Sequence, residues 1–110
     1  VYTGTHDNNT TVGWFYERSP EAQARVVDYL GCIAPKGIHW SMINLALSSV
    51  ANTAIFPLQD ILGLGGEAKM NTPSQAEGNW EWRYHPSALD DEGLREHLKY
   101  VTYLYGRDPQ

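Results

Sequence analysis

The longest uncharged stretch of the chain most limits how it can fold. Residues 37–59, GIHWSMINLALSSVANTAIFPLQ, contain no Asp, Glu, Lys or Arg. Such a stretch must be removed from water, either inside a membrane or inside a protein core. A membrane-spanning helix needs about 18 consecutive apolar residues, and this run is interrupted at His39, Asn44, Asn52, Thr53 and Pro57. We therefore predict two consecutive buried elements and no membrane span.

Helical spacing dominates the first part of this stretch, and β-forming residues dominate the second. We expect a helix over residues 38–51, mostly buried because Met42, Leu45 and Ala46 widen its apolar face. The face itself consists of Trp40, Ile43, Leu47 and Val50. The segment TAIFPL, residues 53–58, is apolar and bounded by turn formers, which predicts a buried strand that ends near Pro57.

Capping residues mark two helices before this stretch. Thr10 or Thr11 can cap a short helix through VGWFYER. Ser19 followed by Pro20 can start a second helix, which we expect to stop at Gly31. The apolar positions of this amphipathic helix are Ala22, Val26, Val27 and Leu30.

A long connection precedes the last predicted helix. Residues 59–88 are rich in Gly, Pro, Asn and Ser and far exceed the usual connection of about 4–6 residues, which indicates a functional or disordered loop. Its aromatic residues favour function. A final helix should begin at Asp90 or Asp91 and run to about Tyr105. Its buried face consists of Leu94, Leu98, Val101 and Tyr105.

The order of these elements predicts an α/β fold with a parallel sheet. Residues 1–3 form a short β-rich segment that ends at Gly4, so the series runs strand, helices, strand, loop, helix. Two strands are too few for such a sheet, so we expect further strands from a larger parent or from other copies. In (β/α)8 barrels the active site lies at the carboxyl ends of the strands. His6 and Asp7 follow one predicted strand, and Gln59 and Asp60 follow the other.

Composition favours a small neutral ligand over charged macromolecules. The net charge is −5, which argues against nucleic acid or an anionic membrane as a partner, and four Trp and seven Tyr are many for this length. Cys32 is the single cysteine, so it can form no internal disulfide, and we expect it to be a small buried side chain. No signal peptide is visible at the start of the chain, and we expect a cytoplasmic location.

The stretch YTGTHDNNTT, residues 2–11, places an ionisable pair, His6 and Asp7, at the end of a predicted strand. Such a pair can bind a polar ligand, orient one another or ligate a metal. It can equally belong to a plain turn in which Asp7, Asn8 and Asn9 bond to the backbone and His6 is merely exposed. The other histidines show no ligand spacing, so we expect no metal and no cofactor.

Taken whole, the chain resembles the C-terminal part of 4-α-glucanotransferases, the amylomaltase or disproportionating-enzyme family of the α-amylase clan. The motifs that carry the resemblance are YTGTHDNNTTVGWF (2–15), ALSSVANTAIFPLQDILGLG (46–65), EAKMNTP (67–73) and GNWEWR (78–83). The resemblance implies about strands seven and eight of a (β/α)8 TIM barrel, as part of one catalytic domain. It also implies α-1,4-glucans or malto-oligosaccharides as substrates, and a cytoplasmic or, in a plant, plastid location.

The resemblance also implies roles for individual residues. Asp7 matches the family's third catalytic carboxylate, which stabilises the transition state, and His6 matches a neighbouring ligand of sugar hydroxyl groups. Asn71 and Pro73 match a loop near the donor sugar, and a plain turn is the alternative for them. Asn9 stands where the family often carries a second acidic residue, and we expect no catalytic role for it. The nucleophilic Asp and the acid/base Glu are implied to lie outside this sequence.

Several other polar and aromatic residues are predicted to be structural. We expect Trp80 and Trp82 to pack, although they could stack on glucose rings. Asp60 is expected to cap the turn that follows it, and Arg83 to pair with a carboxylate of the parent fold. Glu67 and Lys69 are expected to be solvated.

Two classes of function remain open from the sequence. The first is part of an α-glucan transferase, and the second is a carbohydrate-binding module without catalysis, which should be a self-sufficient and usually β-rich fold. For the isolated chain we expect no transfer activity, because a single carboxylate of the three is present. We also expect it to self-associate, or to be partly disordered around residues 59–88, unless the remainder of the barrel is supplied.

Overall fold

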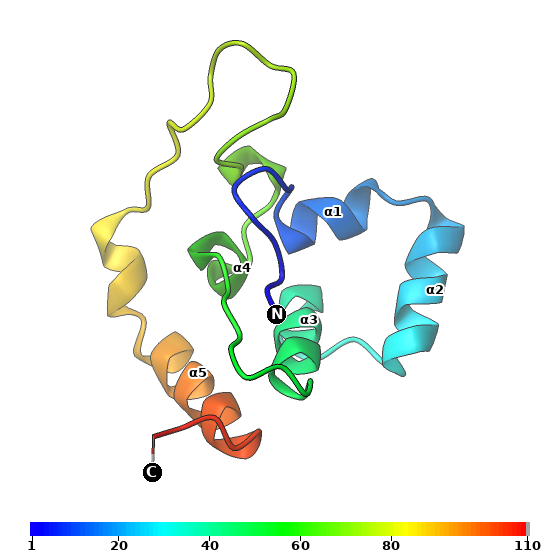
Figure 1. Ribbon diagram of the computed structural model, residues 1–110, viewed down its shortest axis with the longest axis vertical. Helices are drawn as coiled ribbons and strands as arrows, with labels where there is room; N and C mark the ends of the chain where they lie inside the picture. The colour runs from blue at the N-terminus through cyan, green and yellow to red at the C-terminus, as the bar shows by residue number, and fades with distance from the viewer. Residues whose placement is uncertain (110) are drawn as a thin grey trace.

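The structure is a computed structural model that describes residues 1–109, and its regular secondary structure is almost entirely helical (Figure 1). The α-helices are α1 (Thr11–Glu17), α2 (Pro20–Leu30), α3 (Ile38–Leu47), α4 (Leu58–Leu62) and α5 (Glu92–Leu104), and the short 3-10 helices are η1 (Gly66–Ala68) and η2 (Pro86–Asp90). None of the helices in the described part of the chain is long and apolar enough to cross a membrane.

The two predicted strands are reduced to one parallel pairing. Tyr2 and Ile55 form an isolated parallel bridge, and the Ile55 amide donates to the Val1 carbonyl over 2.9 Å. The prediction of neighbouring parallel segments is confirmed, whereas the predicted extent of the strands is wrong. The Val1 amino group also donates to the Thr53 carbonyl over 2.8 Å, but within residues 1–109 the two segments form no longer ladder. Leu58 begins α4 and does not end a strand.

The core lies between α3 and α5, with the extended segment before α4 beside them. Trp40, Ile43, Leu47 and Val101 form its buried cluster. The partly buried side chains packed on that cluster are Ala34, Ala54, Phe56, Ile61, Leu94, Leu98 and Tyr105. The predicted apolar face of the last helix is therefore confirmed, since all four of its members belong to this core.

Helix α3 ends earlier than predicted, at Leu47. The Ser48 hydroxyl donates to the Leu45 carbonyl over 2.9 Å, and the Ser49 hydroxyl donates to the Ala46 carbonyl over 2.7 Å. Such side-chain bonds give the backbone an alternative to the next helical turn. Val50, predicted on the buried face, is consequently fully exposed.

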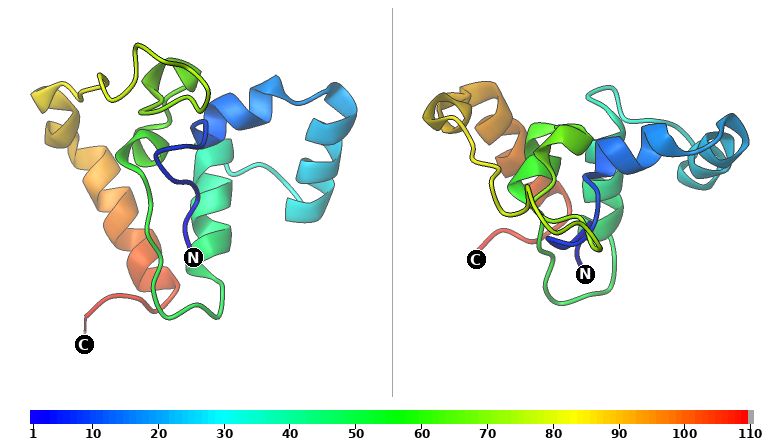
Figure 2. Two further views of the ribbon diagram at one scale, coloured as in Figure 1. Left: turned by 45° about the horizontal axis from the view of Figure 1, so that its top comes forward. Right: turned by 90° about the horizontal axis from the view of Figure 1, so that it is seen from above.

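Local capping signals were predicted correctly. Thr10 accepts from the Gly13 amide, Ser19 from the Ala22 amide and Asp91 from the Leu94 amide. Helix α2 stands away from the core in all views (Figures 1 and 2). Cys32, which follows α2, is exposed, so its predicted burial is wrong. Gly31 turns the chain there with a φ of 87°, which places Cys32 on the link between α2 and α3.

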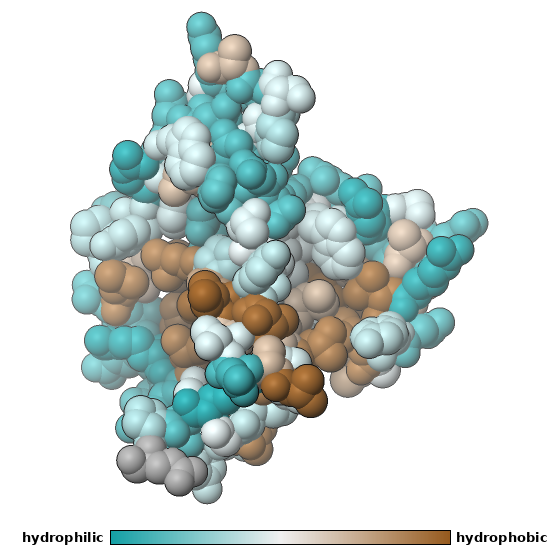
Figure 3. Space-filling view, viewed as in Figure 1, coloured by the Kyte–Doolittle hydropathy of each residue, from teal (hydrophilic) through white to brown (hydrophobic). Residues whose placement is uncertain are grey.

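The segment 59–88 is more ordered than the sequence indicated. It contains most of α4, all of η1 and the start of η2, which the sequence did not predict. On the face shown in Figure 3, hydrophobic side chains gather near the middle of the molecule. The bridged residues Tyr2 and Ile55 are 61% and 63% exposed. The extended pair thus leaves apolar surface uncovered within the described chain.

Candidate active site

The His6–Asp7 pair lies in a tight turn between the first extended segment and α1. The Asn8 amide donates to the Thr5 carbonyl over 3.1 Å, which makes Thr5 to Asn8 a β-turn. The Asn8 side-chain oxygen in return accepts from the Thr5 amide over 2.8 Å. The turn that the sequence left as an alternative is therefore real, and it holds His6 and Asp7 at its exposed tip.

This turn is fixed to a loop far along the chain. The Asn71 side-chain amide donates to Asp7 Oδ1 over 2.6 Å, and the Asn71 backbone amide donates to the His6 carbonyl over 3.1 Å. The structure therefore brings together three of the four predicted site residues. The second carboxylate oxygen of Asp7 lies 3.4 Å from His6 Nε2, and about half of each side chain is exposed. Asp7 thus presents a fixed carboxylate with accessible acceptor capacity.

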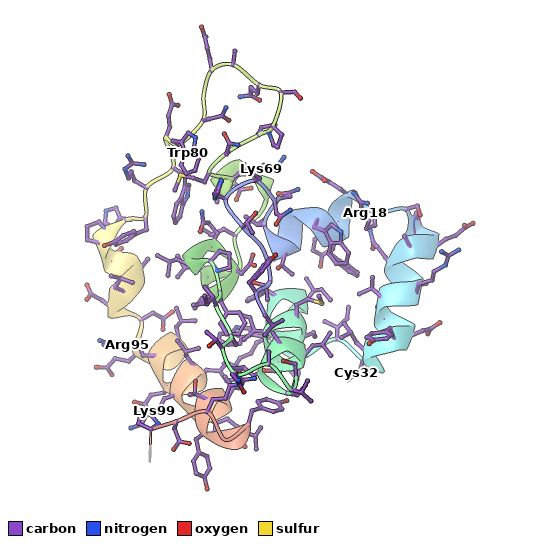
Figure 4. All side chains as sticks on the ribbon, viewed as in Figure 1. Arg18, Cys32, Lys69, Trp80, Arg95 and Lys99 are labelled. Carbon is purple, nitrogen blue, oxygen red and sulfur yellow. The ribbon has the colours of Figure 1, made fainter. Side chains whose placement is uncertain are left out.

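Trp80 is a further member of this cluster, and the sequence predicted packing for it, with stacking on glucose rings as the alternative. Its ring centroid lies 4.8 Å from that of His6, with the rings inclined by 38°. Trp80 is 52% exposed and packs only in part, against His6, and Figure 4 places it on the arm of the loop that returns beside η1. Its φ of 62° is unusual for a bulky residue, and backbone strain of this kind concentrates at functional sites. The motif GNWEWR contained the residue, but no local pattern indicated its contact with His6.

Pro73 shapes the loop and is itself exposed. The Gln75 amide donates to the Thr72 carbonyl over 3.1 Å, and Ser74 has a φ of 72°, which is a type II turn with proline in its preferred position. The Asn79 side chain closes the loop, since it accepts from the Thr72 amide over 2.8 Å and donates to the Gln75 carbonyl. The role predicted for Pro73 in substrate binding stays a prediction.

Asp60 lies beneath the turn and is 2% exposed. It is structural, as expected, but the predicted local cap is not the main contact that it makes. Its carboxylate reaches across the chain and accepts hydrogen bonds from Thr3 and Thr11, on either side of the His6–Asp7 turn.

Four further residues surround the site without entering it. Asn9 donates to Glu17 over 2.8 Å and accepts from the Thr10 amide over 2.8 Å, which gives it a structural task at the start of α1. Glu67 is exposed and Lys69 is half-buried. Arg83 donates to the carbonyls of Trp80 and Trp82 over 3.0 and 2.8 Å. It makes no ion pair with a carboxylate within residues 1–109.

The site carries acceptors and donors suited to hydroxyl groups. A half-exposed carboxylate, an imidazole and a carboxamide lie around a half-exposed indole ring. Carboxylates form strong hydrogen bonds with hydroxyl donors, and aromatic rings offer an apolar face for stacking. Among residues 1–109, no group of three or more His, Cys, Asp or Glu side chains is placed to hold a metal ion.

Comparisons with known proteins agree in pointing to one family. The family model described as 4-alpha-glucanotransferase matches residues 1–90. The 4-alpha-glucanotransferase of Synechocystis is 64% identical over 107 residues, which cover 97% of this chain and 21% of that protein. The chloroplastic/amyloplastic enzyme of Arabidopsis thaliana is 46% identical over 110 residues, covering 97% of this chain and 19% of the relative.

A solved structure shows the same relationship. The amylomaltase from Streptococcus agalactiae in complex with acarbose superposes with a TM-score of 0.91 at 31% identity, covering 98% of this chain and 22% of that chain. The chain therefore spans about a fifth of the length of the relatives that it matches. With a matching family model over residues 1–90, this chain belongs to the 4-alpha-glucanotransferase family.

Proposed function

We propose that this chain is the part of a 4-α-glucanotransferase that supplies the transition-state carboxylate. The observation that carries the proposal is the Asp7 carboxylate, which is half exposed and has one oxygen held by Asn71 at 2.6 Å. It lies in a chain whose relatives are named for glucan transfer, and one relative was solved with acarbose. The chain would then supply about strands seven and eight of a TIM barrel.

The chemistry that we assign to Asp7 follows from a retaining mechanism. One carboxylate attacks the sugar, a second acts as acid and base, and the transition state resembles an oxocarbenium ion. Both groups would lie outside this chain. A third carboxylate that grips ring hydroxyls strengthens those bonds as charge develops, and Asp7 is oriented for this task.

The neighbours of Asp7 have supporting roles in this proposal. His6 would bind a hydroxyl group through a ring nitrogen, and Asn71 would hold the carboxylate and present its amide to the sugar. The glycosyl group would pass to the hydroxyl of a second glucan, with α-1,4-glucans as donor and acceptor. The cytoplasmic or plastid location stays a prediction.

Disproportionation of maltotriose by the full-length protein tests this function. We expect glucose and longer malto-oligosaccharides to appear together, because transfer conserves the number of glycosidic bonds. Release of reducing ends without longer products would indicate hydrolysis and contradict transfer. Binding of maltotriose without any product would favour the carbohydrate-binding alternative, which the largely helical structure does not support.

A further inference from the structure

Asp60 is the one ionisable residue that is buried within residues 1–109. Burying a carboxylate is unfavourable unless hydrogen bonds replace its water. No arginine, lysine or histidine within the described chain forms an ion pair with it. The burial of this carboxylate without an ion-pair partner therefore needs an explanation.

Three hydrogen bonds satisfy this carboxylate, and all come from residues next to the candidate site. Oδ2 accepts from the Thr3 hydroxyl over 2.6 Å and from the Thr11 hydroxyl over 2.9 Å. Oδ1 accepts from the Thr11 backbone amide over 2.8 Å. Hydrogen bonds to an ionised acceptor are about twice as strong as neutral ones.

The two threonines flank the segment that carries the His6–Asp7 turn. Thr3 lies at the end of the first extended segment, and Thr11 is the first residue of α1. The Asp60 carboxylate therefore holds both ends of residues 4–10 at one point. Asp60 is itself held on α4, which packs against α3 and so connects the turn to the core.

The other bonds of the turn are local or reach an exposed loop. Thr5 and Asn8 fix the shape of the turn, and Asn71 links its exposed tip to the loop after η1. The Asp60 bonds tie the turn to α4, which packs against α3. Misplacement of a catalytic group by about 1 Å can reduce a rate by about a hundredfold.

We propose that Asp60 is a positioning residue for glucan transfer, which fixes the turn bearing Asp7 through Thr3 and Thr11. This inference rests on the proposed function. Asp60 touches no substrate in this scheme, so its effect passes through the placement of Asp7. Loss of the anchor should lower kcat more than it changes KM, because the interaction that suffers is made in the transition state.

The variants are chosen to keep the protein folded. Asp60→Asn retains the shape and one acceptor for the Thr11 amide, but it removes the charge and the second oxygen, which accepts from the Thr3 and Thr11 hydroxyls. Thr3→Val removes a single hydrogen bond from a half-buried residue, whereas Thr3→Ser keeps the hydroxyl. Ser41→Ala is the matched control, because Ser41 is buried and accepts one hydrogen bond, from the Ala34 amide, away from the turn.

The test compares kcat, KM and thermal midpoint in the full-length enzyme with maltotriose. We expect Thr3→Val and Asp60→Asn to lower kcat by about tenfold with KM changed by less than about threefold. Thr3→Ser should recover kcat to within about twofold. Ser41→Ala should lower the thermal midpoint and leave kcat unchanged.

Two results overturn the inference in different ways. In the first, the wild type is active, and Thr3→Val and Asp60→Asn lose thermal stability but keep the wild-type kcat. Asp60 then has a structural role alone. A folded wild type that transfers no glucan overturns the proposed function, and the positioning role is lost with it.

Discussion

At each end of the molecule one polar side chain joins segments that are distant in the sequence. The two ends differ in how much hydrogen-bonding capacity remains free for a ligand. At the site end, Asn71 donates to Asp7, which lies 64 residues away in the sequence. At the other end, Arg107 follows α5 and donates to the segment after α3. It contacts the carbonyls of Leu47 at 2.8 Å, Ala51 at 2.7 Å, Ser49 at 3.2 Å and Asn52 at 3.4 Å.

The difference separates a functional contact from a structural one. The Arg107 guanidinium donates to backbone carbonyls at and after the end of α3, which have no partner within the helix. Asp7 uses one oxygen for Asn71 and leaves about half of its side chain exposed. A polar group whose hydrogen bonds are satisfied within the fold supports the structure, whereas one with accessible capacity is available to a ligand.

The largest expected effect tests the site end. Asp7→Asn in the full-length enzyme should lower kcat on maltotriose by about a hundredfold or more, because the charge that stabilises the transition state is lost. Thermal stability should change little, since Asp7 is exposed. Asp28→Asn, the same change at an exposed site on α2, is the control and should behave as the wild type. Near wild-type kcat for Asp7→Asn would remove it from the catalytic set.

The opposite pattern is expected at the other end. Arg107→Ala should lower the free energy of unfolding by about 2 kcal/mol, because several carbonyls lose a charged donor. It should leave kcat unchanged for the enzyme that remains folded. Arg95→Ala on the exposed side of α5 (Figure 4) is the control and should have little effect on stability. Chemical denaturation and maltotriose kinetics measure both, and a fall in kcat with unchanged stability would break the comparison.

A smaller effect is expected from His6. His6→Gln should lower kcat/KM by about tenfold and keep the shape of the pH profile, because glutamine can still bond to a hydroxyl group. The proposed mechanism gives His6 no proton to move. Loss of one limb of the pH profile in this variant would make His6 an acid or base and contradict the assignment.

The sequence predicted what local chemistry decides. The helix caps at Thr10, Ser19 and Asp91 each depend on a residue three positions further on, and all three are formed. The apolar face of α5 follows from helical spacing in the same way. The candidate pair at His6 and Asp7 was likewise visible as an ionisable cluster after an apolar segment.

Contacts between distant segments were not predictable from spacing. Asp60 resembled a local cap, but its carboxylate bonds to residues 49 and 57 positions away. Trp80 resembled a packing residue, and only the fold brings its ring beside His6. The early end of α3 has a partly non-local cause too, because Arg107 stabilises the carbonyls there. In each case a polar or aromatic side chain contacts a residue that is distant in the sequence, and no local sequence pattern indicates that contact.

The smallest expected effect is a dependence of stability on pH. It should arise from His39, next to Asp60, and not from Arg107. Burial lowers the pKa of His39 below its ordinary value, and the neighbouring Asp60 carboxylate opposes this in part. The His39 ring packs against Gly63, which directly follows the helix that carries Asp60. Arginine does not titrate near neutral pH, so the Arg107 end has no matching response.

The sign follows from proton binding by the two states. With the pKa of folded His39 lowered, the unfolded chain binds more protons below about pH 6.5, so the free energy of unfolding falls as the pH drops through that range. Above it the contribution is constant.

We expect His39→Gln to show a smaller loss of stability than the wild type between about pH 7.5 and 5.5. Urea denaturation at both pH values measures the free energy of unfolding of the two proteins. Their difference at pH 7.5 gives the cost of the lost ring packing and serves as the baseline. Part of the slope should persist, because burial also lowers the pKa of His97. An unchanged slope in His39→Gln would show that its titration does not couple to folding.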